Sequence, residues 1–100
     1  MSGPIMTVTS ARVDPTREAD LIAAYRAVLA GKRPDGLVAS ALMRTQDYQW
    51  QIATLWRDRA ALDAMRAGPE PPAAPRVFRS AGAEPVLTVF EVVEATGDVS

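Results

Sequence analysis

An alternation of aromatic and polar residues in the middle of the chain predicts a β-strand. Residues 48–56 hold both tryptophans and one of the two tyrosines of the sequence. Because successive side chains of a strand point to opposite faces, every second residue of this stretch shares a face. The residues of the aromatic face are Tyr48, Trp50, Ile52, Thr54 and Trp56. This face is therefore either part of the hydrophobic core or the wall of a ligand pocket.

An amphipathic helix is predicted upstream of this strand. Its apolar residues recur at intervals of one, three, three and one, which is the helical period. They are Leu21, Ile22, Tyr25, Val28 and Leu29. Asp14 is a good N-cap, Pro15 suits the first helical position, and Gly31 is a typical terminator.

Three further strands are predicted. Residues 5–13 and 86–93 are rich in β-branched residues, which favour strands. Residues 36–45 lie close enough to the aromatic strand to form an antiparallel hairpin with it. Alternation along this strand places Leu37 and Ser40 on opposite faces.

A second helix and a proline-rich loop are predicted after the aromatic strand. Asp58 is placed to cap a helix over residues 59–66. Residues 69–75 contain four prolines, so we expect a loop or a polyproline-like segment there. A short turn at Val77 and Phe78 should then pack back onto the domain.

The resulting order, β-α-β-β-α-β, is that of the ferredoxin-like α+β fold, an antiparallel four-stranded sheet with helices on one face. We expect a single domain over residues 5–94, with flexible ends at residues 1–4 and 95–100. The other face of the sheet has no cover within the chain, and a domain of 100 residues buries only part of its apolar surface. A homodimer that buries this face is therefore expected.

Composition excludes several classes of function. With 48% hydrophobic and 23% charged residues the chain is typical of globular proteins, and no apolar run reaches the roughly 18 residues that a membrane span needs. A net charge of −1 argues against a nucleic-acid partner. The absence of a secretory signal pattern at the N-terminus makes a cytoplasmic location the expectation.

The chemistry available to the chain is also restricted. It has no cysteine and no histidine, which excludes thiolate nucleophiles, imidazole acid–base catalysis, His-ligated haem and Cys/His zinc sites. Its twelve acidic residues are scattered rather than grouped as ligands of Mg²⁺ or Ca²⁺. We therefore expect neither a metal nor a cofactor.

Short motifs along residues 5–93 carry a family resemblance. They are Val13-Asp14-Pro15, Pro34-Asp35-Gly36-Leu37, Leu55-Trp56, Asp58 with Ala61-Leu62, and Gly82-Ala83-Glu84-Pro85. In this order and spacing they resemble the antibiotic biosynthesis monooxygenase family of dimeric α+β barrels. The resemblance implies a homodimer with a pocket in each subunit between sheet and helices. Characterised members of that family oxidise aromatic polyketides with molecular oxygen and without metal or flavin.

The resemblance implies a role for one residue directly. Trp56 matches the tryptophan of the third strand that lines the pocket in active relatives. Haem-degrading relatives bind haem through histidine, which this chain lacks, so haem degradation is not expected. The polyketide oxidases rely on an asparagine near the tryptophan, whereas this sequence has Ile52 and Thr54 there and no asparagine anywhere.

The predicted substrate-binding residues are Trp56, Trp50, Tyr25, Arg44 and Arg57, and no catalytic residue is assigned. The aromatic residues would be pocket walls, and an arginine at the mouth could pair with an acidic phenol or carboxylate. Each also has a structural interpretation, since aromatic stripes fill cores, a buried phenol needs a hydrogen-bond partner, and arginines at strand ends are usually solvated.

Three functions remain open from the sequence. The first is a cofactor-independent monooxygenase acting on an aromatic polyketide-like small molecule. The second is a non-catalytic dimeric module that binds a small apolar molecule. The third is a dimer without any pocket.

Overall fold

A four-stranded antiparallel sheet forms the centre of the protein. The computed structural model describes residues 3–97 of the chain. The strands are β1 (Ile5–Arg12), β2 (Leu37–Arg44), β3 (Gln49–Trp56) and β4 (Val86–Glu91). Their order across the sheet is β2-β3-β1-β4, and every neighbouring pair is antiparallel. This arrangement confirms the predicted ferredoxin-like α+β fold.

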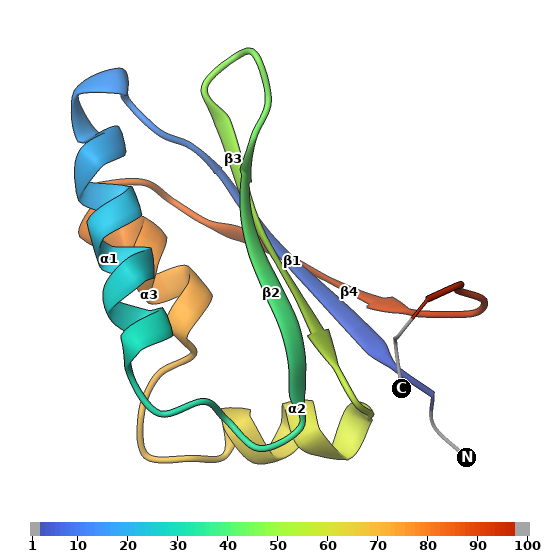
Figure 1. Ribbon diagram of the computed structural model, residues 1–100. Helices are drawn as coiled ribbons and strands as arrows, with labels where there is room; N and C mark the ends of the chain where they lie inside the picture. The colour runs from blue at the N-terminus through green and yellow to red at the C-terminus, as the bar shows by residue number, and fades with distance from the viewer. Residues whose placement is uncertain (1–2, 98–100) are drawn as a thin grey trace.

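The helices lie on one face and at one end of this sheet. They are the short 3₁₀ helix η1 (Pro15–Arg17) and the α-helices α1 (Glu18–Ala30), α2 (Arg59–Arg66) and α3 (Ala73–Ser80). Figure 1 shows α1 and α3 on the same side of the sheet, whereas α2 lies across one end of it. The predicted second helix thus forms with its predicted bounds, but α3 is the helix that packs beside α1.

Helix α3 begins inside the segment predicted to be a loop. That prediction was wrong for residues 73–75, and the predicted turn at Val77 and Phe78 is helical. Pro72 is the N-cap and Pro75 lies in the first turn. The first N–H groups of a helix have no intrahelical acceptor, so the missing N–H of Pro75 removes no hydrogen bond there.

The β2–β3 hairpin differs from prediction in two details. Tyr48 lies in the turn with a φ of 58°, so the alternation of β3 begins only at Gln49 and Tyr48 is exposed. The pairing register shifts between Leu37 and Ala39, which places Leu37 opposite Trp56. Leu37 therefore shares a face with Ser40, and their predicted placement on opposite faces was wrong.

Buried side chains on the helix side of the sheet form two separate clusters. The larger cluster joins α1 and α3 to one end of the sheet through Ala11, Val13, Leu21, Tyr25, Trp50, Ile52, Val77, Phe78, Ala81 and Ala83. The smaller cluster joins α2 to the other end through Ile5, Trp56, Ala61 and Leu62. The two tryptophans of β3 thus belong to different clusters, which determines where a cavity can form.

The opposite face of the sheet is uncovered. Within residues 3–97, no helix lies on that face (Figure 1). Apolar side chains remain exposed there, with Phe90 at 49%, Met43 at 43% and Val86 at 63% of their full exposure.

No helix in the described part of the chain is both long and apolar enough to cross a membrane. The predicted flexible ends include residues 1–2 and 98–100, which lie outside the described residues.

Asp58 is the N-cap of α2 as predicted, whereas Asp14 caps the 3₁₀ helix η1 and the N-cap of α1 is Arg17. Asp58 Oδ1 accepts a hydrogen bond from the Ala61 amide at 2.8 Å, at the start of α2. Asp14 Oδ1 accepts from the Thr16 hydroxyl at 2.7 Å and from the Thr16 amide at 2.9 Å, at the start of η1. These two hydrogen bonds, the hydroxyl first, hold the pKa of Asp14 below its ordinary value.

An Asp14→Ala variant tests this cap through its pH dependence. Because the folded-state pKa lies below the unfolded one, ionised Asp14 stabilises the fold at neutral pH. The contribution is lost as the pH falls through the folded-state pKa. Urea unfolding should therefore show a less stable variant at neutral pH and no difference in strong acid. A difference that persists unchanged into strong acid would exclude the carboxylate charge as its source.

Candidate functional site

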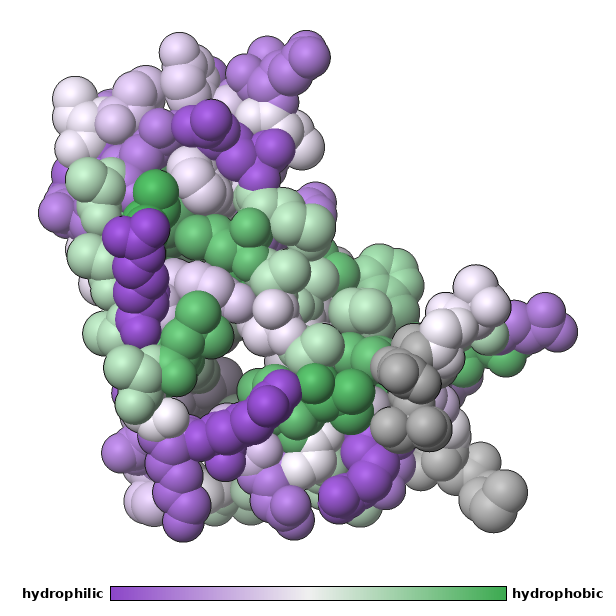
Figure 2. Space-filling view, viewed as in Figure 1, coloured by the Kyte–Doolittle hydropathy of each residue, from purple (hydrophilic) through white to green (hydrophobic). Residues whose placement is uncertain are grey.

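A cavity of about 1360 Å³ lies between the two core clusters. It is bounded by the helix-side face of the sheet, by α1 and α3, and by α2 with the proline-rich segment that follows it. Closed small-molecule pockets usually have roughly 300–1,000 Å³, so this open cavity has room for a ligand of several rings. Figure 2 shows the molecule hollowed here, with hydrophobic residues on both sides of the opening.

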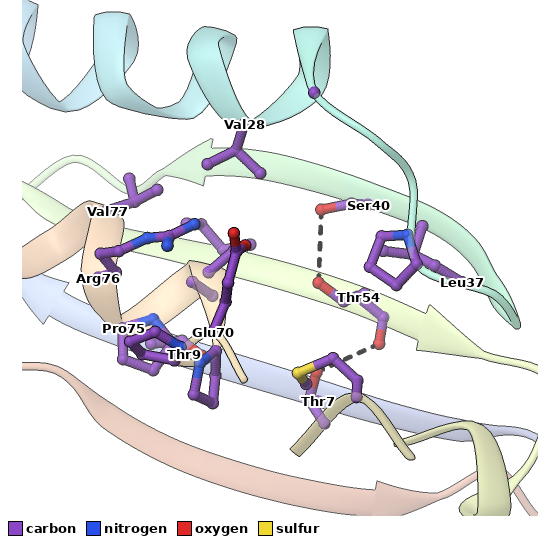
Figure 3. Close-up of a pocket in the computed structure, with 18 of the residues that line it drawn as sticks. Thr7, Thr9, Val28, Leu37, Ser40, Thr54, Glu70, Pro75, Arg76 and Val77 are labelled. Carbon is purple, nitrogen blue, oxygen red and sulfur yellow. Dashed lines mark hydrogen bonds between the residues drawn. The ribbon is translucent and has the colours of Figure 1, made fainter. Parts of the chain in front are cut away.

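The walls of the cavity are mainly apolar. They include Ala24, Val28, Leu37, Ile52, Trp56, Leu62, Met65, Ala74 and Val77. In Figure 3, Val28 of α1 points from above toward the sheet, and Val77 of α3 lies at one side. An apolar wall of this kind stabilises a bound ligand through the area that it removes from water.

The floor of the cavity carries hydroxyl groups from three strands. Thr7 and Thr9 of β1, Ser40 of β2 and Thr54 of β3 all line it. Ser40 Oγ and Thr54 Oγ1 are 3.4 Å apart, and the Thr7 hydroxyl donates to the Thr54 carbonyl oxygen at 3.5 Å (Figure 3). The Tyr25 hydroxyl of α1 lies 2.9 Å from Ser40 Oγ. The floor is thus a polar patch enclosed by apolar walls.

Trp56 lies where the wall meets this floor. Its side chain is only 3% exposed and packs in the cluster with Leu62 and Ala61. The indole N–H donates to Thr7 Oγ1 at 3.2 Å. Because that N–H already donates to Thr7, what Trp56 offers a ligand is its apolar ring.

Trp50 and Arg44 lie together outside the cavity. The Trp50 indole N–H donates to Glu18 Oε2 at 3.2 Å, and Arg44 Nη1 is 3.2 Å from Glu18 Oε1. The Arg44 guanidinium stands over the Trp50 ring, 5.3 Å from its centroid. These three side chains join the β2–β3 hairpin to the start of α1, and neither Trp50 nor Arg44 lines the cavity.

Arg57 also lies outside the cavity lining. It follows β3, its side chain is 55% exposed, and Nε is 3.6 Å from Asp58 Oδ2. Of the five predicted substrate-binding residues, the cavity brings together Tyr25 and Trp56. A role of Trp50, Arg44 and Arg57 in substrate binding stays a prediction.

Charged side chains surround the mouth of the cavity. They are Lys32, Arg33, Asp35, Arg66, Glu70 and Arg76, and all six residues are exposed. In Figure 3, Arg76 of α3 and Glu70 of the proline-rich segment point toward one another across the opening. Among residues 3–97 there is no group of three or more acidic residues placed to hold a metal ion.

Comparisons with known proteins identify the fold. No family model and no curated protein matches the sequence. The structure is similar to that of a candidate antibiotic biosynthesis monooxygenase from Caulobacter crescentus, with a TM-score of 0.72, 18% identity and coverage of 93% of this chain and 92% of the other. The chain has the antibiotic biosynthesis monooxygenase fold. The resemblance stated from the sequence is thus confirmed at the level of fold.

Two further structures share this fold. SnoaB, a cofactor-independent oxygenase from Streptomyces nogalater, has a TM-score of 0.66, 18% identity, and coverage of 94% of this chain and 97% of the other. A heme-degrading protein from Mycobacterium tuberculosis has a TM-score of 0.63, 23% identity, and coverage of 97% and 99%. One fold therefore hosts different chemistries, and function must be argued from the site.

The hydroxyl floor of the cavity is a feature that the sequence analysis did not predict. Thr7 and Thr9 are two residues apart in a predicted strand, so alternation requires them to share a face. Thr54 lies on the aromatic face that alternation predicts. Hydroxyls that recur with the strand period beside a tryptophan are the signal that could have revealed the floor.

Proposed function

We propose that this chain belongs to the antibiotic biosynthesis monooxygenase family and oxygenates an aromatic, polyketide-like small molecule in its cavity without a cofactor. One observation carries the proposal: a cavity of about 1360 Å³ has apolar walls, the ring of Trp56 at its edge and hydroxyl groups on its floor. The shared fold with a cofactor-independent oxygenase supports the same chemistry.

The reaction needs little from the protein beyond binding. In the conversion of an anthrone to a quinone, a ring methylene loses two hydrogen atoms and gains one oxygen atom of O₂. The second oxygen atom leaves with those hydrogens as water, so the substrate supplies all the electrons. The site has to exclude water, orient the ring and position the substrate oxygen. The apolar walls and the hydroxyl floor suit these tasks.

Non-catalytic binding is the second candidate function, and the placement of the ionisable groups favours it. Tyr25 is the one ionisable residue that is both buried and in the cavity lining, within the described chain. All charged lining residues are exposed at the mouth, so no carboxylate lies deep enough to act as a general base on a buried ring. A protein with this site could carry or sense an aromatic molecule without changing it.

Oxygen uptake with anthrone separates the two candidates. We expect chelator-treated protein to bind anthrone and to consume one O₂ per quinone formed, above the rate in buffer alone. Binding without extra oxygen uptake would support the carrier.

A Val28→Phe variant tests the position of the ligand. It should weaken the affinity for anthrone roughly tenfold, since excess bulk in a pocket lowers binding by that much or more. Val93→Phe is the matched control, because Val93 is 88% exposed and does not line the cavity. A protein that neither binds anthrone nor consumes oxygen contradicts both candidates.

We further propose that the protein is a homodimer joined through the uncovered sheet face. Phe90, Met43 and Val86 leave apolar area exposed on this face. A second copy placed by a two-fold axis would bury the same face on both chains.

A further inference from the structure

Three hydroxyl groups in the cavity form one continuous chain. The Tyr25 hydroxyl is 2.9 Å from Ser40 Oγ, and Ser40 Oγ is 3.4 Å from Thr54 Oγ1. In both contacts either oxygen can be the donor. The three groups come from α1, β2 and β3, and each lines the cavity. We call this set of Tyr25, Ser40 and Thr54 the hydroxyl chain.

The hydrogen bonds within the hydroxyl chain do not use all of its protons. Three hydroxyl groups carry three protons, and the two contacts between them use two. Among the hydrogen bonds of residues 3–97, none takes the third proton. Whichever way the chain is oriented, one O–H is therefore available to an acceptor outside it.

The neighbouring Thr7 shows the contrast. Its hydroxyl donates to the Thr54 carbonyl oxygen and accepts from the Trp56 indole N–H. Both partners are fixed in direction, because a carbonyl only accepts and an indole N–H only donates. The Thr7 hydroxyl is thus held in one orientation. In the hydroxyl chain, by contrast, the direction of donation along both hydrogen bonds can reverse.

We propose that the hydroxyl chain is the specificity-determining element of the cavity, with Tyr25 binding a ligand oxygen either as donor or as acceptor. The inference rests on the proposed function, since it assumes that an aromatic ligand occupies the cavity. When Tyr25 donates to a ligand ketone, Thr54 donates to Ser40 and Ser40 to Tyr25. When Tyr25 accepts from a ligand phenol, its own proton goes to Ser40, that of Ser40 goes to Thr54, and the free O–H is then that of Thr54. The ligand class is an aromatic ring system that carries a ketone or a phenol.

Selectivity against plain hydrocarbons follows from the same geometry. A ligand without oxygen would cover the hydroxyl chain with apolar surface and make no hydrogen bond to Tyr25, whereas a ketone accepts the spare proton and a phenol donates to the Tyr25 oxygen. Leaving a buried polar group unpaired costs more than a hydrogen bond gains, so sites of this kind reject ligands that lack the matching group. The apolar walls alone would not make this distinction.

Three probes with one carbon frame test the inference: tetralin, α-tetralone, and the tetrahydronaphthol whose hydroxyl is on the aromatic ring. Calorimetric titration should show that the protein binds the ketone and the phenol each about fivefold more tightly than tetralin, the ratio for one neutral hydrogen bond. In Tyr25→Phe both preferences should disappear while the affinity for tetralin stays within about twofold. Tyr48→Phe is the matched control, since Tyr48 is exposed and outside the cavity lining.

The outcomes separate this inference from the proposed function. If the wild-type protein binds all three probes equally, the inference is overturned while the cavity remains a binding site. If only the ketone or only the phenol is preferred, reversal of the hydroxyl chain is overturned. If no probe binds, the proposed function fails and the inference fails with it. The comparison of the three probe affinities in the wild-type protein tests the inference even if Tyr25→Phe does not fold.

Discussion

The Gly36→Ala variant is expected to lose about 3 kcal/mol of unfolding free energy, a large part of the roughly 5–15 kcal/mol that such a domain has. Gly36 has a φ of 85°, in the left-handed region, where a side chain costs roughly 1–2 kcal/mol. A Cβ added there would also overlap the Cβ of Ala61, and overpacking of this kind typically costs about 1–3 kcal/mol. Neither group can turn aside, because both Cβ atoms are fixed by the backbone.

The position of Gly36 explains why no other residue suits it. Its carbonyl oxygen accepts from the Arg57 amide at 2.8 Å, which joins the start of β2 to the residue after β3. Its α-carbon packs against Ala61 in α2, at the end of the sheet where α2 closes the cavity. The variant would have to move α2 or the turn, and either movement disturbs the smaller core cluster.

Gly82→Ala is the matched control for this variant. Gly82 also has a positive φ, at 75°, but a Cβ there would meet only the guanidinium of Arg17, at 3.1 Å. That side chain is long and can shift, so we expect a loss of about 1 kcal/mol, from the backbone conformation alone. Urea unfolding with equal m-values in all three proteins would make the comparison valid. Equal losses in both variants would show that the contact with Ala61 is not responsible.

Local signals in the sequence were sufficient for most of the fold. Asp58 and Asp14 begin helices because their side chains accept the first free N–H groups, a property that depends only on neighbouring residues. The strands β2 and β3 follow from alternation, and β1 and β4 from their β-branched residues, in the same local way. The start of α3 differs from prediction because the four prolines of residues 69–75 are not equivalent: Pro72 is the N-cap and Pro75 lies in the first turn. A proline blocks a helix interior but not its first turn, and which prolines lie there depends on where Phe78 and Val77 pack.

The candidate site could be predicted only in part. Trp50 and Trp56 do share a face of β3, as alternation requires, but only Trp56 lines the cavity. Helices α1 and α3 cover the end of the sheet that carries Trp50 and leave the middle open. How far a helix reaches along a sheet depends on crossing geometry and on side-chain packing between distant segments. The pairing of Tyr25 with Ser40 depends on the same packing, so the sequence could place a phenol on the inner face but not name its partner.

A Phe90→Lys variant is expected to convert the proposed dimer to a monomer. Phe90 is 49% exposed and lies on the uncovered face of β4, where it pairs with Met6. An edge strand tolerates lysine in a monomer, whereas the interface would have to bury two unpaired ammonium groups. We expect the dissociation constant of the dimer to rise at least about 100-fold, since an uncompensated buried charge costs several kcal/mol. Light scattering over a concentration series should give twice 10.7 kDa for the wild-type protein and 10.7 kDa for the variant.

Leu29→Lys is the control, because it adds the same charge at an apolar residue with 59% exposure, but on α1 across the sheet. It should keep the dimeric mass. A wild-type mass of 10.7 kDa at every concentration would refute the dimer itself. If Leu29→Lys dissociated the protein and Phe90→Lys did not, the copies would be joined on the helix side. Because Leu29 lines the cavity, the second copy would then border the ligand site, and the mouth of the cavity would open into an interface rather than into solvent.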